Sequence, residues 1–263
     1  MLPFLFFGIA GVSTLTKGFS AMPSCILLGL HMNLALFILP MAFWRGLRIV
    51  VGLTLSFYLI RQVRKPSRWV GRPFLWMMNK SHSDLTDWGL HHVQVGKDFT
   101  VLDVGCGGGR TIQKLAAITN RKVYGIDYAA GSVAESNANN AALVRTGRVA
   151  IVRASVSALP FSDDTFDLAT AIETQYYWPN LVNDMKEIRR VLKPGGTLVV
   201  IAEAYKYGGN AKAHDAVVRL LGKGCMSVTE HRELCATAGY TDIEISENRK
   251  RGWICVMGRK AEA

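Results

Sequence analysis

The stretch Val101-Leu-Asp-Val-Gly-Cys-Gly-Gly-Gly-Arg-Thr-Ile112 decides the fold, because an apolar strand runs here into a glycine-rich turn and then into a helical pattern. The glycines at Gly105, Gly107 and Gly109 allow backbone angles that residues with a Cβ rarely adopt. A ligand can therefore lie against bare peptide at the N-terminus of the following helix. The stretch predicts a pocket for a nucleotide-type cofactor.

The spacing of these glycines bears on which cofactor is bound. A dinucleotide fingerprint, G-x-G-x-x-G, would place a third glycine where this chain has Arg110. Asp103, just before the loop, suits a cationic group better than a pyrophosphate. A second apolar run ends in Asp127, an acid suited to ribose hydroxyls. An adenosine-containing ligand is therefore expected, and a nicotinamide-dependent oxidoreductase is the weaker alternative.

Four segments together resemble the class I S-adenosylmethionine-dependent methyltransferases, and among them the small-molecule type called methyltransferase type 11. Each is a weak signal alone, but their order and spacing are specific. They cover roughly residues 80 to 260. The segments are Val101 to Arg110, Tyr124 to Asp127, Leu159-Pro-Phe-Ser-Asp-Asp-Thr-Phe-Asp-Leu-Ala169 and Leu192-Lys-Pro-Gly-Gly-Thr-Leu-Val199.

The resemblance assigns parts of S-adenosylmethionine to individual residues. The glycine loop, including Cys106, would face the methionine part and the ribose. Asp103 would receive the amino group and Asp127 the two ribose hydroxyls. Adenine would lie between Tyr128 and the loop with Ser155 and Val156, where this chain lacks the acid commonly found in the family. A serine makes a weaker contact there than a carboxylate.

The apolar pattern predicts the same α/β fold without the resemblance. Seven apolar runs mostly alternate with helical patterns, which is typical of an open, Rossmann-like, mostly parallel sheet covered by helices on both faces. The last two runs are too close for a crossover helix and should form an antiparallel hairpin. Pro194-Gly195-Gly196 is expected to be a turn. The runs are 99–104, 122–126, 149–153, 166–172, 197–202, 241–245 and 253–258.

Glu173-Thr-Gln-Tyr-Tyr-Trp-Pro179, after the fourth run, is the first candidate for binding the methyl acceptor. Tyr176, Tyr177 and Trp178 suit a flat or apolar acceptor. Glu173 is the candidate catalytic base if desolvation raises its pKa. In the competing interpretation, the aromatic side chains pack beneath the next helix and Glu173 only orders the cofactor.

The segment 80–92 is the second candidate, as a helix start that could close over the cofactor like a lid. Its Trp88 would then contact the acceptor. His82, His91 and His92 are expected to be surface or packing residues rather than bases.

The N-terminal region differs sharply in composition, since no acidic residue precedes Asp84. Residues 21–44 carry no formal charge and are long enough to span a bilayer. Residues 1–15 are short for a span, and residues 49–60 would lie near the interface or complete a hairpin. We expect a membrane anchor of one or two transmembrane helices in residues 1–72, and a methyltransferase domain in residues 73–263. A buried helical pair capping that domain is the alternative.

Charge predicts the orientation of this anchor. Nine positive charges precede the first acid, which leaves only +2 of the formal net charge of +11 for the rest of the chain. Most of the nine follow the long apolar segment, so the catalytic domain should face the cytoplasm. Basic residues beside the membrane favour anionic head groups and do not indicate a nucleic-acid partner.

The function expected from the sequence is methyl transfer from S-adenosylmethionine to a small, lipophilic acceptor at the membrane. The main alternative is a catalytically silent, membrane-tethered binding module with the same fold. The five cysteines form no C-x-x-C pair and have no histidine at zinc spacing, so no metal site is predicted. Cys106 is expected to be a small side chain between glycines rather than a nucleophile.

Overall fold

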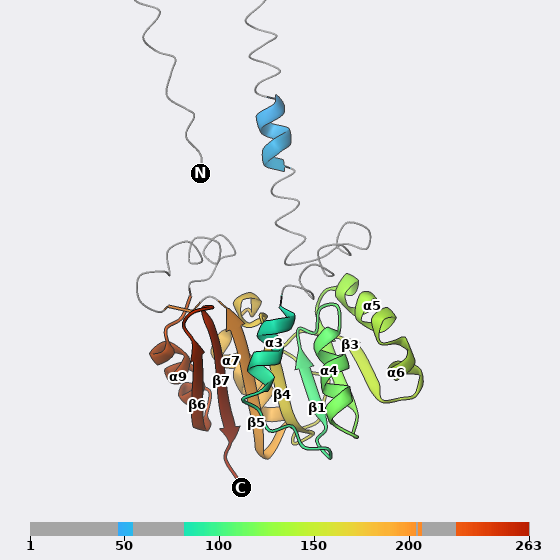
Figure 1. The fold of residues 1–263 in the computed structure, drawn as a ribbon, viewed down its shortest axis with the longest axis vertical. Coiled ribbons are helices and arrows are strands. Elements are labelled where there is room, and N and C mark those ends of the chain that lie inside the picture. Colours follow the sequence, from blue (N-terminus) through green and yellow to red (C-terminus); the bar gives the residue numbers. More distant parts are fainter. Residues whose placement is uncertain (1–46, 55–81, 204, 207–224, 263) are drawn as a thin grey trace, which may run out of the picture. The chain divides into compact units, whose positions relative to one another are not determined.

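The computed structural model describes residues 47–54, 82–203, 205–206 and 225–262 of the chain (Figure 1). The apolar segments 1–15 and 21–44 and the predicted domain boundary at residue 72 lie outside these residues. Residues 47–54 form a helix whose apolar side chains Leu47, Ile49, Val50, Val51 and Leu53 are exposed. None of the described helices is long and apolar enough to cross a membrane.

The described part of residues 82–262 contains one seven-stranded sheet with the order β3-β2-β1-β4-β5-β7-β6 (Figure 1). The first five strands are parallel, and β7 is antiparallel to both of its neighbours. This confirms the mostly parallel sheet and the C-terminal hairpin predicted from the apolar runs. The strands are β1 (Val101–Val104), β2 (Val123–Asp127), β3 (Val149–Arg153), β4 (Phe166–Ile172), β5 (Leu192–Glu203), β6 (Tyr240–Asn248) and β7 (Trp253–Lys260).

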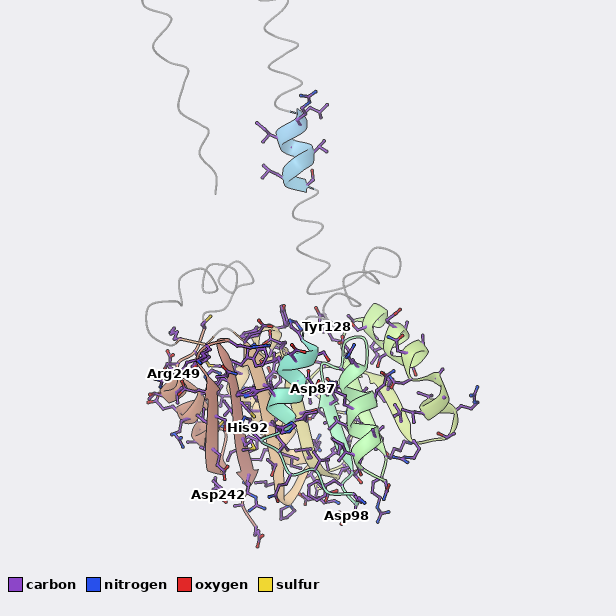
Figure 2. All side chains as sticks on the ribbon, viewed as in Figure 1. Asp87, His92, Asp98, Tyr128, Asp242 and Arg249 are labelled. Atoms are coloured by element: carbon purple, nitrogen blue, oxygen red, sulfur yellow. The ribbon has the colours of Figure 1, made fainter. Side chains whose placement is uncertain are left out.

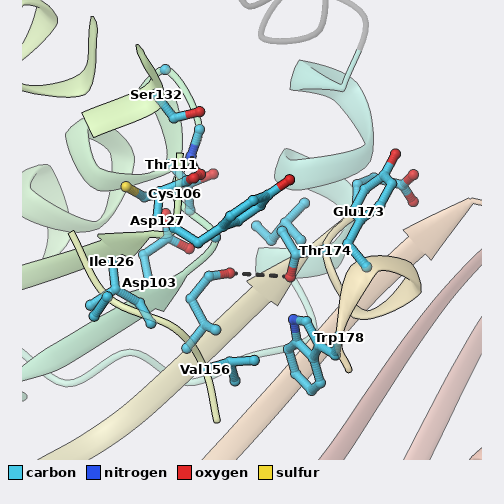
Figure 3. Close-up of a pocket in the computed structure, with 18 of the residues that line it drawn as sticks. Asp103, Cys106, Thr111, Ile126, Asp127, Ser132, Val156, Glu173, Thr174 and Trp178 are labelled. Atoms are coloured by element: carbon cyan, nitrogen blue, oxygen red, sulfur yellow. Dashed lines mark hydrogen bonds between the residues drawn. The ribbon is translucent and has the colours of Figure 1, made fainter. Parts of the chain in front are cut away.

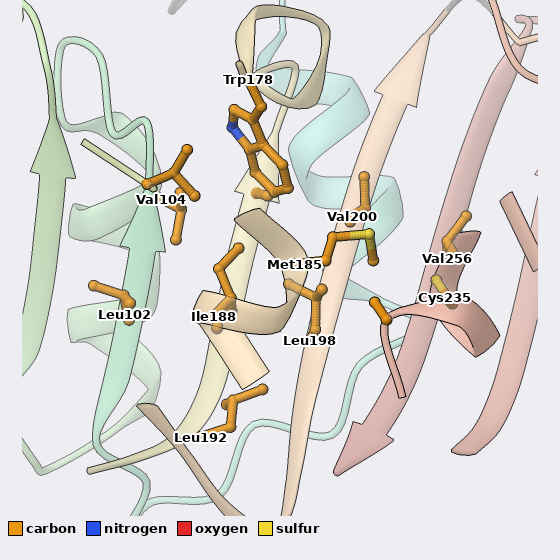
Figure 4. Packing of buried hydrophobic residues seen from close by; sticks show 14 of the residues in the cluster. Leu102, Val104, Trp178, Met185, Ile188, Leu192, Leu198, Val200, Cys235 and Val256 are labelled. Atoms are coloured by element: carbon orange, nitrogen blue, oxygen red, sulfur yellow. The ribbon is translucent and has the colours of Figure 1, made fainter. Parts of the chain in front are cut away.

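Helices cover both faces of the sheet, as the pattern predicted. Alternation along β1 directs Leu102 and Val104 to one face and Val101 to the other. The first face packs on α7 and α9 (Figure 4), and the second on α3 and α4. The helices are α3 (Ser83–Leu90), α4 (Arg110–Ile118), α5 (Ala130–Asn139), α6 (Ala141–Arg145), α7 (Leu181–Val191) and α9 (Val228–Thr237), with the short 3₁₀ helix η1 (Gln175–Tyr177).

Pro194-Gly195-Gly196 lies within the bounds of β5 rather than between a helix and a strand. It nevertheless interrupts the pairing, because the partner of Phe166 is Leu192 and the partner of Leu168 is Thr197. Gly195 has a φ of 74°. The cluster is therefore a bulge at which the pairing of β5 with β4 is interrupted and then resumes. The sequence predicted a plain turn at this position.

Strand order places the candidate site. The chain winds from β1 to β2 and β3 on one side, and then crosses back to β4 and β5 on the other. The carboxyl ends of β1 and β4 therefore flank a topological switch point, where open α/β sheets bind their ligands.

Candidate functional site

A cavity of about 370 Å³ opens at this switch point. Its walls come from the carboxyl ends of β1, β2 and β4, the loops that follow β3 and β4, and the start of α3 (Figure 3). This volume lies within the range of small-molecule and cofactor sites. Most of the residues predicted from the glycine motif line it.

Each glycine of the loop has its own structural role. A Cβ on Gly105 would lie 2.5 Å from the methyl carbon of Thr174, so Gly105 lets the β4 loop approach closely. The Thr174 hydroxyl then donates a hydrogen bond to the carbonyl of Val104, at 3.1 Å. Gly107 has a φ of 51° and open space where a Cβ would be. Of the three, Gly107 leaves the most room for a ligand.

Gly109 does not line the cavity, although the sequence placed it against the cofactor. It has a φ of 79° at the N-terminus of α4, and a Cβ there would lie 2.3 Å from the Ser136 hydroxyl. Asn140 donates a hydrogen bond to its carbonyl at 3.1 Å. Gly109 thus allows α5 to pack against the loop.

Asp127 ends β2 and holds the glycine loop. One carboxylate oxygen accepts from the backbone N–H of Gly107 at 3.1 Å, and the other accepts from Ala129 at 2.8 Å. The Ser132 side chain also hydrogen-bonds this carboxylate, which leaves about one of its roughly four lone-pair sites for a ligand hydroxyl. Burial raises the pKa of Asp127, and these hydrogen bonds oppose the rise. The position fits the predicted ribose role.

Asp103 lies at the bottom of the cavity and is almost completely buried. The Thr170 hydroxyl donates a hydrogen bond to its carboxylate, at 2.8 Å. Burial raises the pKa of Asp103 to about 7, and the nearby carboxylate of Asp127 adds to the rise. A cationic ligand group would stabilise the ionised form, as the predicted contact with an amino group requires.

The predicted adenine end also borders the cavity. Tyr128, Ser155 and Val156 all line it. Tyr128 follows β2 and is exposed (Figure 2), whereas Val156 belongs to the hydrophobic core. The Ser155 hydroxyl already accepts from the backbone N–H of Ser157 at 3.2 Å. A flat group between Tyr128 and Val156 would therefore meet mainly apolar surface.

Cys106, within the glycine loop, is buried beside α5, with its sulfur 3.8 Å from the Ser136 hydroxyl, and it lines the cavity. Burial raises the pKa of its thiol well above the usual value, and the Asp103 carboxylate contributes. Because the thiolate is the nucleophilic form, Cys106 is unsuited to covalent catalysis. Its environment matches the small packing residue that the sequence predicted.

Glu173 follows β4 at the other end of the cavity, in the left-handed region with a φ of 57°. Such a conformation costs about 1–3 kcal/mol for a residue with a side chain and is frequent at functional sites. The Glu173 N–H donates to the carbonyl of Ile201 at 2.9 Å, and its carboxyl accepts from the backbone N–H of Glu203. These bonds fix its position.

Burial raises the pKa of Glu173 to about 8, and the nearby Glu203 carboxylate adds to this effect. The group is therefore mostly protonated at pH 7. A proton-transfer role for Glu173 was predicted on the condition that desolvation raises its pKa, and the pKa is raised. It also means that the protonated acid is the common form.

The three aromatic residues of this loop have different surroundings. Tyr177 and Trp178 line the cavity, and Trp178 is also part of the core. Tyr176 does not line the cavity; it packs against the core, and its hydroxyl donates to the carbonyl of Glu203. Tyr176 was predicted to bind the acceptor, but its position supports the β4 and β5 ends instead.

Helix α3 is packed on the sheet and does not lie over the cavity as a lid. Leu85 is completely buried, and Gly89 lies so close to Ile201 that a Cβ would be 2.4 Å from it. Trp88 does not line the cavity but packs against Trp253, with ring centroids 5.7 Å apart. The predicted substrate role of Trp88 thus has no support in its position.

His82, at the start of α3, was expected to be a surface or packing residue, yet it lines the cavity. Its Nε2 lies 3.5 Å from the Glu203 carboxylate. His91, the C-cap of α3, and His92 are exposed and do not line the cavity. Figure 2 shows His92. Sequence reasoning also missed other lining residues: Thr86, Arg110, Thr111, Ser132 and Thr174.

These features fit the predicted cofactor. Two buried carboxylates beside a ligand-sized cavity suit a molecule with a cationic end and a ribose, and Gly107 leaves room against the backbone. No cluster of three or more metal-binding side chains occurs within the described parts of the chain.

Comparison with known proteins agrees with this geometry. Residues 102–200 match the family model described as a methyltransferase domain. The sterol 4-C-methyltransferase of Caenorhabditis elegans is 33% identical over 54% of this chain and 42% of its own length. Cycloartenol-C-24-methyltransferase 1 of Oryza sativa is 37% identical over 38% of this chain and 29% of its own length. The chain thus matches less than half of the length of these two relatives.

Solved structures share the fold. Geranyl diphosphate C-methyltransferase from Streptomyces coelicolor, in complex with S-adenosyl-L-homocysteine, gives a TM-score of 0.59 at 18% identity, over 68% of this chain and 76% of its own. A phosphoethanolamine N-methyltransferase of Haemonchus contortus, in complex with S-adenosyl-L-methionine, gives 0.60 at 15% identity, over 68% and 53%. Those two proteins hold S-adenosyl-L-homocysteine and S-adenosyl-L-methionine, and this chain shares their fold.

Proposed function

We propose that this chain, whose residues 102–200 match a methyltransferase domain, is a class I S-adenosylmethionine-dependent enzyme that transfers a methyl group to a small lipophilic acceptor. The observation that carries the proposal is the cavity at the β1–β4 switch point. Two buried acids lie at its glycine-loop end, and Glu173 with two aromatic side chains lies at its other end. One end suits the cofactor and the other an apolar acceptor.

The cofactor supplies a methyl group already activated on a cationic sulfur. The chain's own task is then to align the acceptor with that methyl group, to exclude water and to handle the acceptor's proton. Tyr177 and Trp178 give the acceptor end an aromatic wall, and Glu173 places a titratable group there. The relatives are named for sterol substrates, which supports an apolar acceptor over a nucleic acid.

We further propose that residues 1–72 anchor the chain in a membrane, with the methyltransferase domain facing the cytoplasm. The charge-free segment 21–44 and the basic residues that follow it support this. Protease accessibility of the C-terminus in sealed membrane vesicles tests the orientation. Release of the full-length chain from membranes by alkaline carbonate extraction would count against any membrane anchor.

Methyl transfer tests the proposed activity. The full-length chain is incubated with methyl-labelled S-adenosylmethionine and a membrane-plus-cytosol extract, which is then partitioned between organic and aqueous phases. We expect label in the organic phase with the wild type and little with Asp127→Ala. Cofactor binding without transfer to any fraction would favour the silent binding module.

A further inference from the structure

Beside the acceptor end of the cavity lies a group of polar side chains that the cofactor does not explain. His82 comes from the start of α3, Glu173 follows β4, and Glu203 ends β5. Tyr176 joins the last two, because its hydroxyl donates to the Glu203 carbonyl and lies 3.5 Å from the Glu173 carboxyl. His82 and Glu203 are 121 positions apart in the chain but lie in contact at this site.

The geometry of His82 favours one tautomer. Because Nε2 lies 3.5 Å from a Glu203 carboxylate oxygen, the Nε2–H form is stabilised. Nδ1 is then unprotonated and has a lone pair. A carboxylate that holds one imidazole nitrogen while the other accepts a proton is the arrangement found in hydrolase triads. His82 lines the cavity, whereas Glu203 contacts His82 but is not among the lining residues.

The geometry of Glu173 favours the opposite role. One carboxyl oxygen, Oε1, accepts the Glu203 backbone N–H and lies near the Tyr176 hydroxyl. A proton on this group therefore belongs on Oε2. A neutral carboxylic acid in this position can donate a hydrogen bond to an acceptor oxygen or nitrogen.

We infer that His82, oriented by Glu203, accepts the proton of the methyl acceptor, while Glu173 donates a hydrogen bond that orients it. This inference rests on the proposed methyl transfer. The acceptor atom forms its bond to the methyl carbon as the methyl–sulfur bond breaks and its electron pair stays on sulfur. The acceptor's proton moves to Nδ1 of His82, and the resulting imidazolium pairs with the Glu203 carboxylate. Atoms and charge balance without another reactant.

The charges around His82 are consistent with a neutral base. Burial lowers the pKa of His82, and the Glu203 carboxylate opposes this effect. On its own helix, Asp84 and Asp87 are paired with Arg251 and Lys114, respectively. Arg110 of α4 lines the same cavity. With the pKa of Glu173 raised to about 8, a neutral His82 and a protonated Glu173 coexist near pH 7.

The dependence of transfer on pH separates the two assignments. If Glu173 were the base, single-turnover transfer would rise as pH increases through about 8, because the carboxylate would be the active form. If His82 is the base and Glu173 the hydrogen-bond donor, transfer falls through the same range. The assay uses methyl-labelled S-adenosylmethionine and a total lipid extract, with the full chain between pH 6 and 9.

Variants identify the groups. His82→Gln is expected to lower transfer by about 10²–10⁴-fold, and Glu203→Gln by less, both with unchanged affinity for S-adenosylhomocysteine. Glu173→Gln keeps a hydrogen-bond donor, so it should retain most transfer and lose the fall above pH 8. His92→Gln, exposed just beyond the end of α3, and the exposed Glu244→Gln are the controls. Wild-type transfer in His82→Gln would overturn the inference.

Histidine NMR separates this inference from the proposed activity. In the full chain with S-adenosylhomocysteine, ¹⁵N shifts should show His82 as the Nε2–H tautomer, and Glu203→Gln should lower its pKa. The inferred pairing of His82 with Glu203 would be overturned by an Nδ1–H tautomer, or by a His82 pKa that Glu203→Gln leaves unchanged. If the wild type binds the cofactor but transfers no label, the proposed activity fails, and the NMR result alone decides whether the pair exists.

Discussion

The two ends of the cavity are built differently. At the glycine-loop end, Asp103 and Gly107 are neighbours in the chain, and Asp127 follows on the next strand. At the acceptor end, His82, Glu173 and Glu203 come from three elements distant in sequence. The difference shows that the residues of a cofactor end can come from neighbouring segments of the chain. The residues of an acceptor end are brought together only by the tertiary packing of distant elements.

Both ends nevertheless hold a carboxyl group with a raised pKa, Asp103 at one end and Glu173 at the other, and each should lower the stability of the chain when no ligand is bound. The folded-state pKa of Asp103 is raised from 3.8 to about 7. Between these values the folded state keeps a proton that the unfolded state loses, so stability falls as pH rises through this window. Asp103→Asn should therefore stabilise the cofactor-free chain at pH 8, on the order of 1–4 kcal/mol. Urea unfolding at pH 4 and pH 8 measures this, and equal stabilisation at both values would contradict it.

The next largest effect is expected from Asp127→Ala. This change removes the partner of the Gly107 and Ala129 N–H groups as well as the proposed ribose contact. Affinity for S-adenosylmethionine should fall by about 1–3 kcal/mol. Isothermal titration calorimetry measures the loss, with the exposed Asp98→Ala as a matched control (Figure 2). Unchanged affinity would sink the ribose assignment.

A smaller effect should follow from pH alone. Because Asp103 must be ionised to pair with the cofactor's amino group, affinity should fall as pH drops below about 7, by at most tenfold per unit. Asp103→Asn should bind more weakly and lose this dependence between pH 5.5 and 7. A variant that keeps the wild-type dependence would show that another group titrates.

The smallest effect is expected at the adenine end. The Ser155 hydroxyl already accepts a hydrogen bond from Ser157, and Ser155 is exposed. Ser155→Ala should therefore change cofactor affinity by less than about threefold, well below the range of a lost buried hydrogen bond. A larger loss on calorimetric titration would give Ser155 a direct role in holding adenine.

The sheet was predictable because most of its strands are short apolar runs, and its hairpin was predictable because the connection between β6 and β7 is too short for a crossover helix. Asp103 and Gly107 were predictable because they belong to one local motif, and Asp127 was predictable because it ends the next apolar run; all three line the cavity. Gly109 was misplaced because spacing cannot tell a glycine that meets a ligand from one that meets a helix.

Other residues depend on long-range packing. Trp88 and Tyr176 were predicted to bind the acceptor because they are aromatic. The register of α3 and the turn of η1 direct them toward the core instead. His82 had no distinguishing neighbour in sequence, because its partner Glu203 lies at the end of β5. The left-handed conformation of Glu173 likewise depends on contacts with β5.

The most direct test of the account is a crystal structure of the chain with S-adenosylhomocysteine. We predict that the ribose hydroxyls lie within hydrogen-bond distance of Asp127 and the amino group near Asp103. The sulfur should point toward the end of the cavity that holds Glu173 and His82. A ligand bound with its ribose at the Glu173 end, or outside this cavity, would contradict the account.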